Sequence, residues 1–193
     1  MGTINDLALL IPGRGNVLIG AAEAAVPSFA SIVAYGANFA TAIPGFATLG
    51  HTDPEDLPEW GSDGGDTEVR RTWERLAVRE VTTDPPVNYF VVKPLQFDND
   101  TMKLYEGGGT YSTPNVFASP SSPAPTVASA IIVYLDGAAV VAEYVPRVSI
   151  RKEGSPEHSV DDWSKLPLRF TQLSPTTALK PHYWIGENFG TPA

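Results

Sequence analysis

The sequence predicts a mainly β fold, and three observations lead to this prediction. The chain has 193 residues, a length that suits one domain with its own core, so we expect a single domain over residues 1–193. Runs of β-branched and aromatic residues occur at residues 88–95 and on both sides of Asp136-Gly137. The 17 glycines and 18 prolines are more than an average chain contains, so many turns should separate the strands.

The first 50 residues predict an N-terminal arm over about residues 1–16, followed by short strands at residues 17–20 and 46–50. The start of the chain lacks the basic residues of a secretory signal, so we expect no export by that route. Residues 24–50 carry no charge, but prolines and polar residues interrupt them and no lysine or arginine flanks them. We therefore expect no membrane span.

A long acidic loop is expected over about residues 51–66, where six acidic residues occur among prolines and glycines without any lysine or arginine. Residues 67–81 are ambiguous. Helical spacing of their apolar residues favours a helix, whereas a break near Trp73 would give two short strands. Trp60 and Trp73 suit anchors of a protein interface, although ordinary core packing explains Trp73 as well.

Three further elements follow along the chain. Residues 88–95 predict a strand, and Asp98 suits the N-cap of a short α-helix over about residues 99–105 that ends at the following glycines. Four prolines among serines predict a long loop over about residues 111–126.

The strongest local signal is a long hairpin that turns at Asp136-Gly137. Pro146 interrupts its second strand, so we expect a bulge or an edge there, and this edge is a candidate contact with another chain. A capping-box spacing at Ser159 predicts a helical turn, and residues 168–173 and 182–185 predict closing strands.

No pattern of catalytic, cofactor or metal-binding residues stands out. The chain lacks cysteine, its three histidines are scattered, and its glycine runs match neither a dinucleotide fingerprint nor a phosphate-binding loop. The acidic residues around His158 suit a solvated turn better than acid–base chemistry. We therefore expect no enzymatic activity, no catalytic residues, no cofactor and no metal site.

The charge of the chain bears on its partners. A formal net charge of −9 disfavours tight binding of nucleic acid or anionic membranes. Charged residues make up only 18% of the chain, below the roughly 25% of an ordinary soluble domain. Part of the surface is therefore expected to lie buried against partners, as in an assembly of copies of the chain.

The order of four segments carries a family resemblance: GDTEVRRTWERLAVREV, NYFVVKPLQFDNDTMKLYEGGG, the hairpin, and VSIRKEG with LPLRFTQLSP. Over about residues 45–175 the chain resembles the major tail proteins, or tail tube subunits, of long non-contractile-tailed phages of actinobacteria. The block at residues 96–108 is the most specific part.

The resemblance implies a β-sandwich or barrel core with one short helix, and strands rather than a helix at residues 67–81. It further implies hexameric rings whose strands join into one inner barrel, and rings stacked into a tube through which DNA passes without specific binding. The chain would then reside in the virion tail, after assembly in the host cytoplasm, with tape measure and tail tip or terminator proteins as partners.

Two hypotheses follow about surfaces. The acidic charge is expected to concentrate in the lumen of the tube, where it would repel DNA and let it slide. The candidate subunit or ring contacts are Leu57, Trp60, Trp73 and Pro146. Two other classes remain open: a monomeric β-sandwich binding module of a virion or cell surface, and a carboxylate-based hydrolase.

Overall fold

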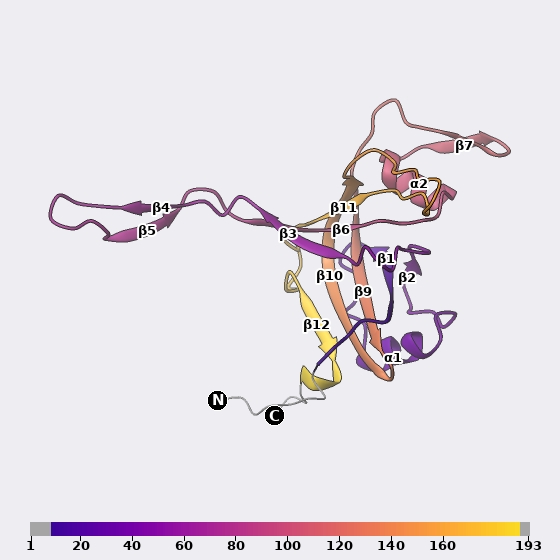
Figure 1. The fold of residues 1–193 in the computed structure, drawn as a ribbon, viewed down its shortest axis with the longest axis horizontal. Helices are drawn as coiled ribbons and strands as arrows, with labels where there is room; N and C mark the ends of the chain where they lie inside the picture. The colour runs from indigo at the N-terminus through magenta and orange to yellow at the C-terminus, as the bar shows by residue number, and fades with distance from the viewer. Residues whose placement is uncertain (1–8, 190–193) are drawn as a thin grey trace.

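The computed structural model describes residues 9–189 and is mainly β, which confirms the predicted fold class (Figure 1). The strands are β1 (Arg14–Ala21), β2 (Phe46–Thr48), β3 (Glu59–Asp63), β4 (Thr67–Arg70), β5 (Arg79–Thr82), β6 (Val87–Val92), β7 (Thr110–Thr113), β8 (Val116–Ala118), β9 (Thr126–Asp136), β10 (Ala139–Lys152), β11 (Leu168–Gln172) and β12 (Tyr183–Gly186). The helices are α1 (Phe29–Ala37), α2 (Asn99–Glu106) and the short 3-10 helix η2 (Glu187–Phe189).

Eight strands form one antiparallel sheet in the order β2-β1-β9-β10-β11-β6-β3, with β12 also paired to β10. The sheet is open, because β2 and β3 are its two ends, so the expected barrel does not close within this chain. The predicted β9–β10 hairpin forms, but its two loop residues are Gly137 and Ala138 rather than Asp136 and Gly137, because Asp136 still pairs with Ala139. Gly137 has φ 58°, the conformation that the first loop residue of such tight hairpins requires.

A bulge divides β10 and shapes the sheet. The pairing with β9 shifts register between Val145 and Val148, which confirms the bulge predicted at Pro146. Before the bulge β10 pairs with β12, and after it β10 pairs with β11. Because a bulge bends and twists a strand, it marks the place where β10 changes its partner from β12 to β11.

Apolar side chains pack on both faces of the sheet. Alternate residues of β9 supply the two clusters, with Ala130 and Ile132 on one face and Ile131 and Val133 on the other. The first cluster includes a stacked pair, Phe90 and Phe170, whose ring centroids are 4.7 Å apart. Helix α2 packs on β10 beside this cluster, whereas α1 covers the opposite face.

Helix α2 confirms the predicted short helix. The side chain of Asp98 accepts hydrogen bonds from the backbone N–H groups of Asp100 (3.1 Å) and Thr101 (2.9 Å), and the helix ends at Gly107. Tyr105 is buried, and its hydroxyl donates to the carbonyl of Gly154. The helix therefore fixes the turn that follows β10.

Loss of this cap should weaken the fold. We expect Asp98→Ala to lower the free energy of unfolding by about 1 kcal/mol, because two backbone donors lose their acceptor. Urea unfolding followed by circular dichroism measures the change. Asp100→Ala is the matched control, since Asp100 makes only an exposed ion pair with Lys103 (3.8 Å) and should cost less than about 0.5 kcal/mol. Equal losses in both variants would contradict the capping role.

Helix α1 corrects the expectation of a single helix. Ser28 caps it, accepting a hydrogen bond from the N–H of Ser31 at 3.2 Å, and Ile32 and Tyr35 are buried against the second cluster. Its residues include β-branched and aromatic types with moderate helix propensity, so packing on the sheet supports the helix more than intrinsic propensity does. Among residues 9–189 no helix is long and apolar enough to cross a membrane.

Several predicted loops contain strands. The second half of the expected acidic loop is β3, because residues 59–63 pair with β6. The expected loop at residues 111–126 contains the β7–β8 hairpin, since its prolines lie outside the paired positions. The predicted N-terminal arm overlaps β1 from Arg14, and its residues 1–8 lie outside the described part. The helical turn predicted at Ser159 is absent: residues 157–163 contain only a bridge and bends.

The ambiguous residues 67–81 form two strands, β4 and β5, as the family resemblance implies. The strands predicted at residues 88–95, 168–173 and 182–185 are confirmed as β6, β11 and β12. Between β3 and β6 the chain extends away from the body as a two-stranded projection, here called the hairpin arm (residues 64–86; Figure 1).

Candidate assembly surfaces

The hairpin arm is the most exposed part of the described chain. β4 and β5 pair only with each other, in a separate two-stranded sheet. At the junction with the body, Gly64 and Gly65 have φ of 74° and 80°, a left-handed conformation that other residues rarely adopt. Two large apolar side chains occupy the tip: Trp73 is 99% exposed and Leu76 is 85% exposed.

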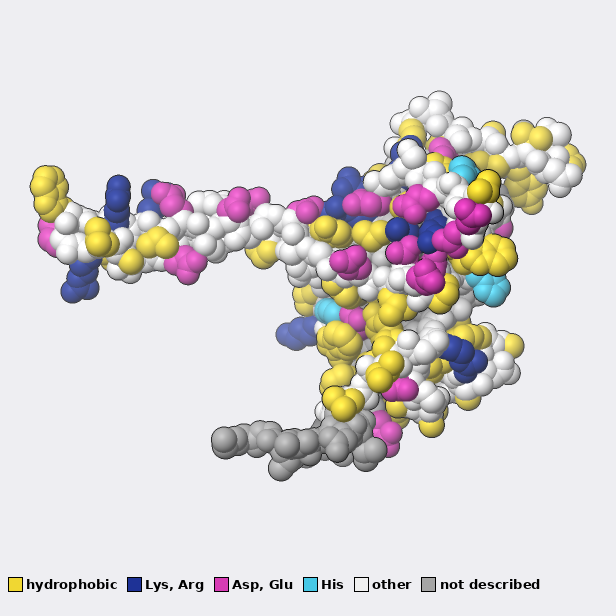
Figure 2. Space-filling model, viewed as in Figure 1, with side chains coloured by type: hydrophobic (Ala, Val, Ile, Leu, Met, Phe, Trp, Pro, Cys, Tyr) yellow, Lys and Arg dark blue, Asp and Glu magenta, His cyan; other side chains and the backbone are white. Residues whose placement is uncertain are grey.

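The tip of the arm, residues 70–79, is also basic in an acidic chain. It holds four arginines and one glutamate, and Figure 2 shows basic and apolar side chains along the arm. Within the arm the structure has one ion pair, between Arg70 and Glu68 at 2.9 Å. Arg71, Arg75 and Arg79 make no ion pair within the described part of the chain, so their charges are available to a partner.

A network around Lys165 joins two loops of the body, residues 53–57 and 157–163. We call these two loops together the acidic face. The Lys165 ammonium contacts Asp53, Asp56 (3.1 Å) and Asp162 (3.0 Å). Lys93 adds ion pairs to Asp56 (3.3 Å) and Glu157 (3.5 Å). Figure 2 shows acidic side chains gathered on the body.

Hydrogen bonding accounts for the pKa shifts in this network. Hydrogen bonds from Lys165 hold the pKa values of Asp53 and Asp56 below the usual value of 3.8. The same carboxylates raise the pKa of Lys165. Because the folded-state pKa values of these aspartates are lowered, their stabilising contribution is present above pH 3.8 and is lost as pH falls through the folded-state values.

Replacing Lys165 should therefore have a pH-dependent cost. We expect Lys165→Met to lower the free energy of unfolding by about 3 kcal/mol near pH 6, since a buried carboxylate loses its partner. The difference from the unmodified chain should shrink as pH falls toward about 3, because protonated carboxyls need no cation. Urea unfolding at several pH values measures both quantities. Lys103→Met, at an exposed ion pair, is the control; a pH-independent loss in Lys165→Met would contradict the role of the network.

A second ionic contact holds the base of the hairpin arm. Arg169 on β11 contacts Asp63 at the end of β3 and Glu153 (3.3 Å). Its guanidinium lies over the ring of Tyr89, 3.5 Å from the ring centroid. These contacts cross from β11 to β3 over β6, so they fix the strands from which the arm extends.

The structure separates the four predicted contact residues into two pairs. Leu57, on the acidic face, is 47% exposed and Trp73 is fully exposed at the arm tip, so the alternative of core packing for Trp73 is wrong. Trp60 points inward, where its ring lies 4.9 Å from Phe90 and 5.0 Å from His182, centroid to centroid. Pro146 is buried in the bulge rather than exposed at an edge.

A buried polar group beside His182, the residue on which Trp60 stacks, was not predicted from the sequence. Glu143, in β10, is 2% exposed and accepts a hydrogen bond from the Tyr134 hydroxyl at 2.8 Å. His182 Nε2 lies 3.1 Å from its other oxygen. Burial, and then the negative charge of Glu143, raise the pKa of Tyr134, which keeps the phenol protonated as a donor. Side chains alternate between the two faces along β10, and both faces of the sheet are covered. This alternation is the sequence signal that could have predicted the burial of Glu143.

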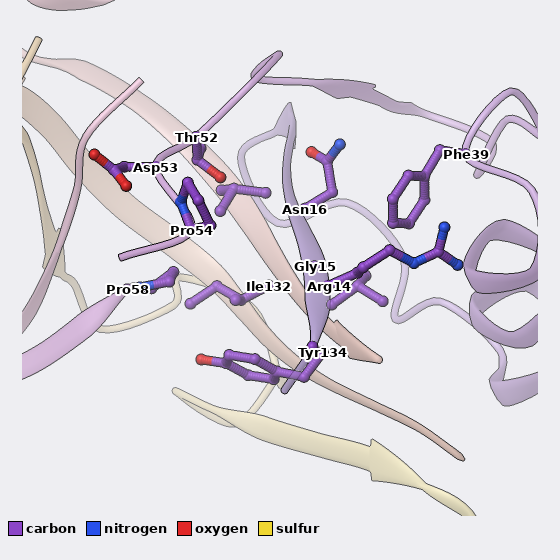
Figure 3. A pocket seen from close by; sticks show the side chains of 13 residues that line it. Arg14, Gly15, Asn16, Phe39, Thr52, Asp53, Pro54, Pro58, Ile132 and Tyr134 are labelled. Carbon is purple, nitrogen blue, oxygen red and sulfur yellow. The ribbon is translucent and has the colours of Figure 1, made fainter. Parts of the chain in front are cut away.

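A cavity of about 230 Å³ lies between β1, β9 and residues 52–58 (Figure 3). This volume is below the range of typical small-molecule pockets. Arg14 lies beside the ring of Phe39, 5.5 Å from its centroid, and the Asp53 carboxylate is held by Lys165. The ionisable side chains that line the cavity are thus already in contact with other residues and form no catalytic arrangement.

Comparisons with known proteins show the family to which the chain is similar. Residues 2–193 match the family described as phage tail tube protein. The chain is also 34% identical over 188 residues to the proteins named Major tail protein Gp23 of Mycobacterium phage D29 and of Mycobacterium phage L5. Each alignment covers 95% of this chain and 93% of the relative.

Proposed function

The chain belongs to the family of phage tail tube proteins, a structural and non-enzymatic component of the virion tail, and from this premise we propose that its copies form stacked rings around a DNA conduit. Six copies per ring is the number that the family resemblance implies. The monomeric binding module is the less favoured hypothesis, because the match to the tail tube family spans residues 2–193.

The hairpin arm is the observation that carries this proposal. An isolated two-stranded hairpin is marginally stable in water, and large apolar side chains at its tip are costly to expose. Within residues 9–189 the chain covers almost none of Trp73 and little of Leu76. Packing the arm on another copy removes both costs, so self-assembly accounts for an element that a monomer does not need.

The open sheet supports ring formation. Among residues 9–189, β2 and β3 each have one side without a strand partner, and such edges tend to pair with other chains. In a ring of identical copies, the edge of one copy can meet the other edge of the next copy. This is a head-to-tail contact that closes by rotation, and it would complete between copies the barrel that one chain leaves open.

The acidic balance supports the role of a conduit. A formal charge of −9 per copy, repeated around a ring, gives a wall that repels the phosphate backbone. DNA would then slide through the lumen without specific binding. We propose that acidic side chains line this lumen, and that tape measure, tail tip and terminator proteins are the tail partners, met in the host cytoplasm during assembly.

Self-assembly of the purified chain tests the proposal. Negative-stain electron microscopy and sedimentation at several concentrations should show rings or hollow tubes, alone or after addition of a tail tip complex as initiator. A chain that stays monomeric under both conditions would overturn the proposal and favour the monomeric binding module.

A further inference from the structure

We propose that the tip of the hairpin arm of one copy docks on the acidic face of a second copy, through Trp73 and Leu76 against the apolar residues of that face. This inference rests on the proposed function, because it names the two surfaces that meet between copies. The donor surface is residues 70–79, and the acceptor surface is the two loops joined by Lys165.

The acceptor surface combines negative charge with exposed apolar side chains. The tip of the arm combines positive charge with exposed apolar side chains, so the two surfaces are complementary. Its six carboxylates outnumber the two lysines that pair with some of them, and Glu55 and Asp161 have no ion-pair partner within residues 9–189. Val160 is 99% exposed, and Trp163 and Leu57 are also exposed. Large apolar side chains exposed on one surface and rimmed by polar groups mark candidate protein contacts.

The acceptor is also held in place before any partner binds. Lys165 contacts aspartates of both loops, so residues 53–57 and 157–163 keep a fixed relative position. A preformed surface loses less conformational entropy on binding than a mobile loop does. The arm is the surface that can adjust its position on binding, because within residues 9–189 it joins the body only through its base.

Charge selects this pairing over the alternatives. Two arm tips carry like charge, as do two acidic faces, and close like-charge contacts disfavour association. A tip on an acidic face brings unpaired arginines to unpaired carboxylates. Exposed ion pairs add little affinity themselves, so burial of the apolar side chains supplies the affinity and the charges set the orientation.

The contact is heterologous, since two different surfaces of the chain meet. Such a contact continues from copy to copy without limit unless rotation closes it. An arm that points away from its own body therefore suits a link to a neighbouring copy (Figure 1).

Cysteine cross-linking tests which surfaces meet. The chain has no cysteine, so Ala77→Cys in the tip and Ser159→Cys in the acidic face introduce the only thiols, both at exposed positions beside the proposed apolar contact residues. Assembled protein that carries both substitutions, treated with a short bismaleimide, should give a ladder of multimers on a denaturing gel. Mixed assemblies of the two single variants should give dimers. An Ala77→Cys variant that cross-links only to itself, or a double variant that assembles without giving a ladder, would overturn the inference.

Charge exchange tests the chemistry. Arg71→Glu with Arg75→Glu should raise the concentration for half-maximal assembly at least about tenfold, and adding Glu55→Lys with Asp161→Lys should restore it. Arg151→Glu with Lys180→Glu changes the charge equally at exposed sites outside both surfaces, and should have little effect.

The outcomes separate this inference from the proposed function. If the unmodified chain forms rings or tubes and the Arg71/Arg75 variant forms them equally well, the docking is refuted and the proposed function stands. If the arginines contact DNA or another protein, the acidic-face substitutions would not restore assembly, which also refutes it. A chain that never assembles refutes the proposed function itself.

Discussion

Replacing Trp73 and Leu76 by alanine is expected to prevent tube assembly while leaving the isolated subunit as stable as before. Both side chains protrude from the arm tip and contact little of their own chain, so the free energy of unfolding should change by less than about 0.5 kcal/mol. A tryptophan buried at the centre of an interface contributes about 2 kcal/mol or more, roughly a thirtyfold change in affinity per contact. Because every copy makes the contact, the loss accumulates along the tube.

Sedimentation and electron microscopy measure assembly, and urea unfolding of the unassembled subunit measures stability. Trp60→Ala is the matched control. The Trp60 ring packs inside the sheet against Phe90 and His182, so this substitution should lower stability by about 3 kcal/mol. Normal tubes from the Trp73/Leu76 variant would contradict a role for the arm in assembly.

Phe170→Ala should be among the most destabilising substitutions of the body. Phe170 is fully buried and stacks on Phe90 within the first apolar cluster, on the face of the sheet where α2 packs. Removing a buried phenylalanine costs about 3–5 kcal/mol, through lost burial and the cavity that remains. A domain is stable by only about 5–15 kcal/mol, so the variant should lose about a fifth or more of its stability.

Chemical unfolding of the subunit, followed by tryptophan fluorescence, measures this loss. Phe97→Ala provides the comparison, since Phe97 is about half exposed beside His158 and should cost much less. A similar loss in both variants would contradict the position of Phe170 in the core.

The elements that were predicted correctly carry their signals in neighbouring residues. The β9–β10 hairpin follows from two β-rich runs around a glycine turn, and α2 follows from the cap at Asp98. Helix α1 lacked such a signal, because its residues favour strands as much as helices and its support comes from packing on distant residues of β9.

The candidate surfaces depended on contacts that span the chain. Asp63 was assigned to a loop, yet it ends a strand and meets Arg169, more than 100 residues later. Trp60 was expected at a surface because acidic residues surround it, but its pairing with Phe90 turns it inward. Residue type and setting predict Trp73 and Leu57 as contact residues, and only the fold shows that they lie on separate surfaces.

The continuity of β3 and β6 with the hairpin arm has a mechanical consequence. A force that pulls on the tip along the arm runs parallel to these strands and reaches the sheet through the pairing of β6 with β11 and of β3 with β6. The backbone hydrogen bonds lie perpendicular to the strands, so such a force shears several bonds together and does not open them one at a time. When a tail bends, tension between neighbouring copies would thus enter each body as a shear load across its sheet.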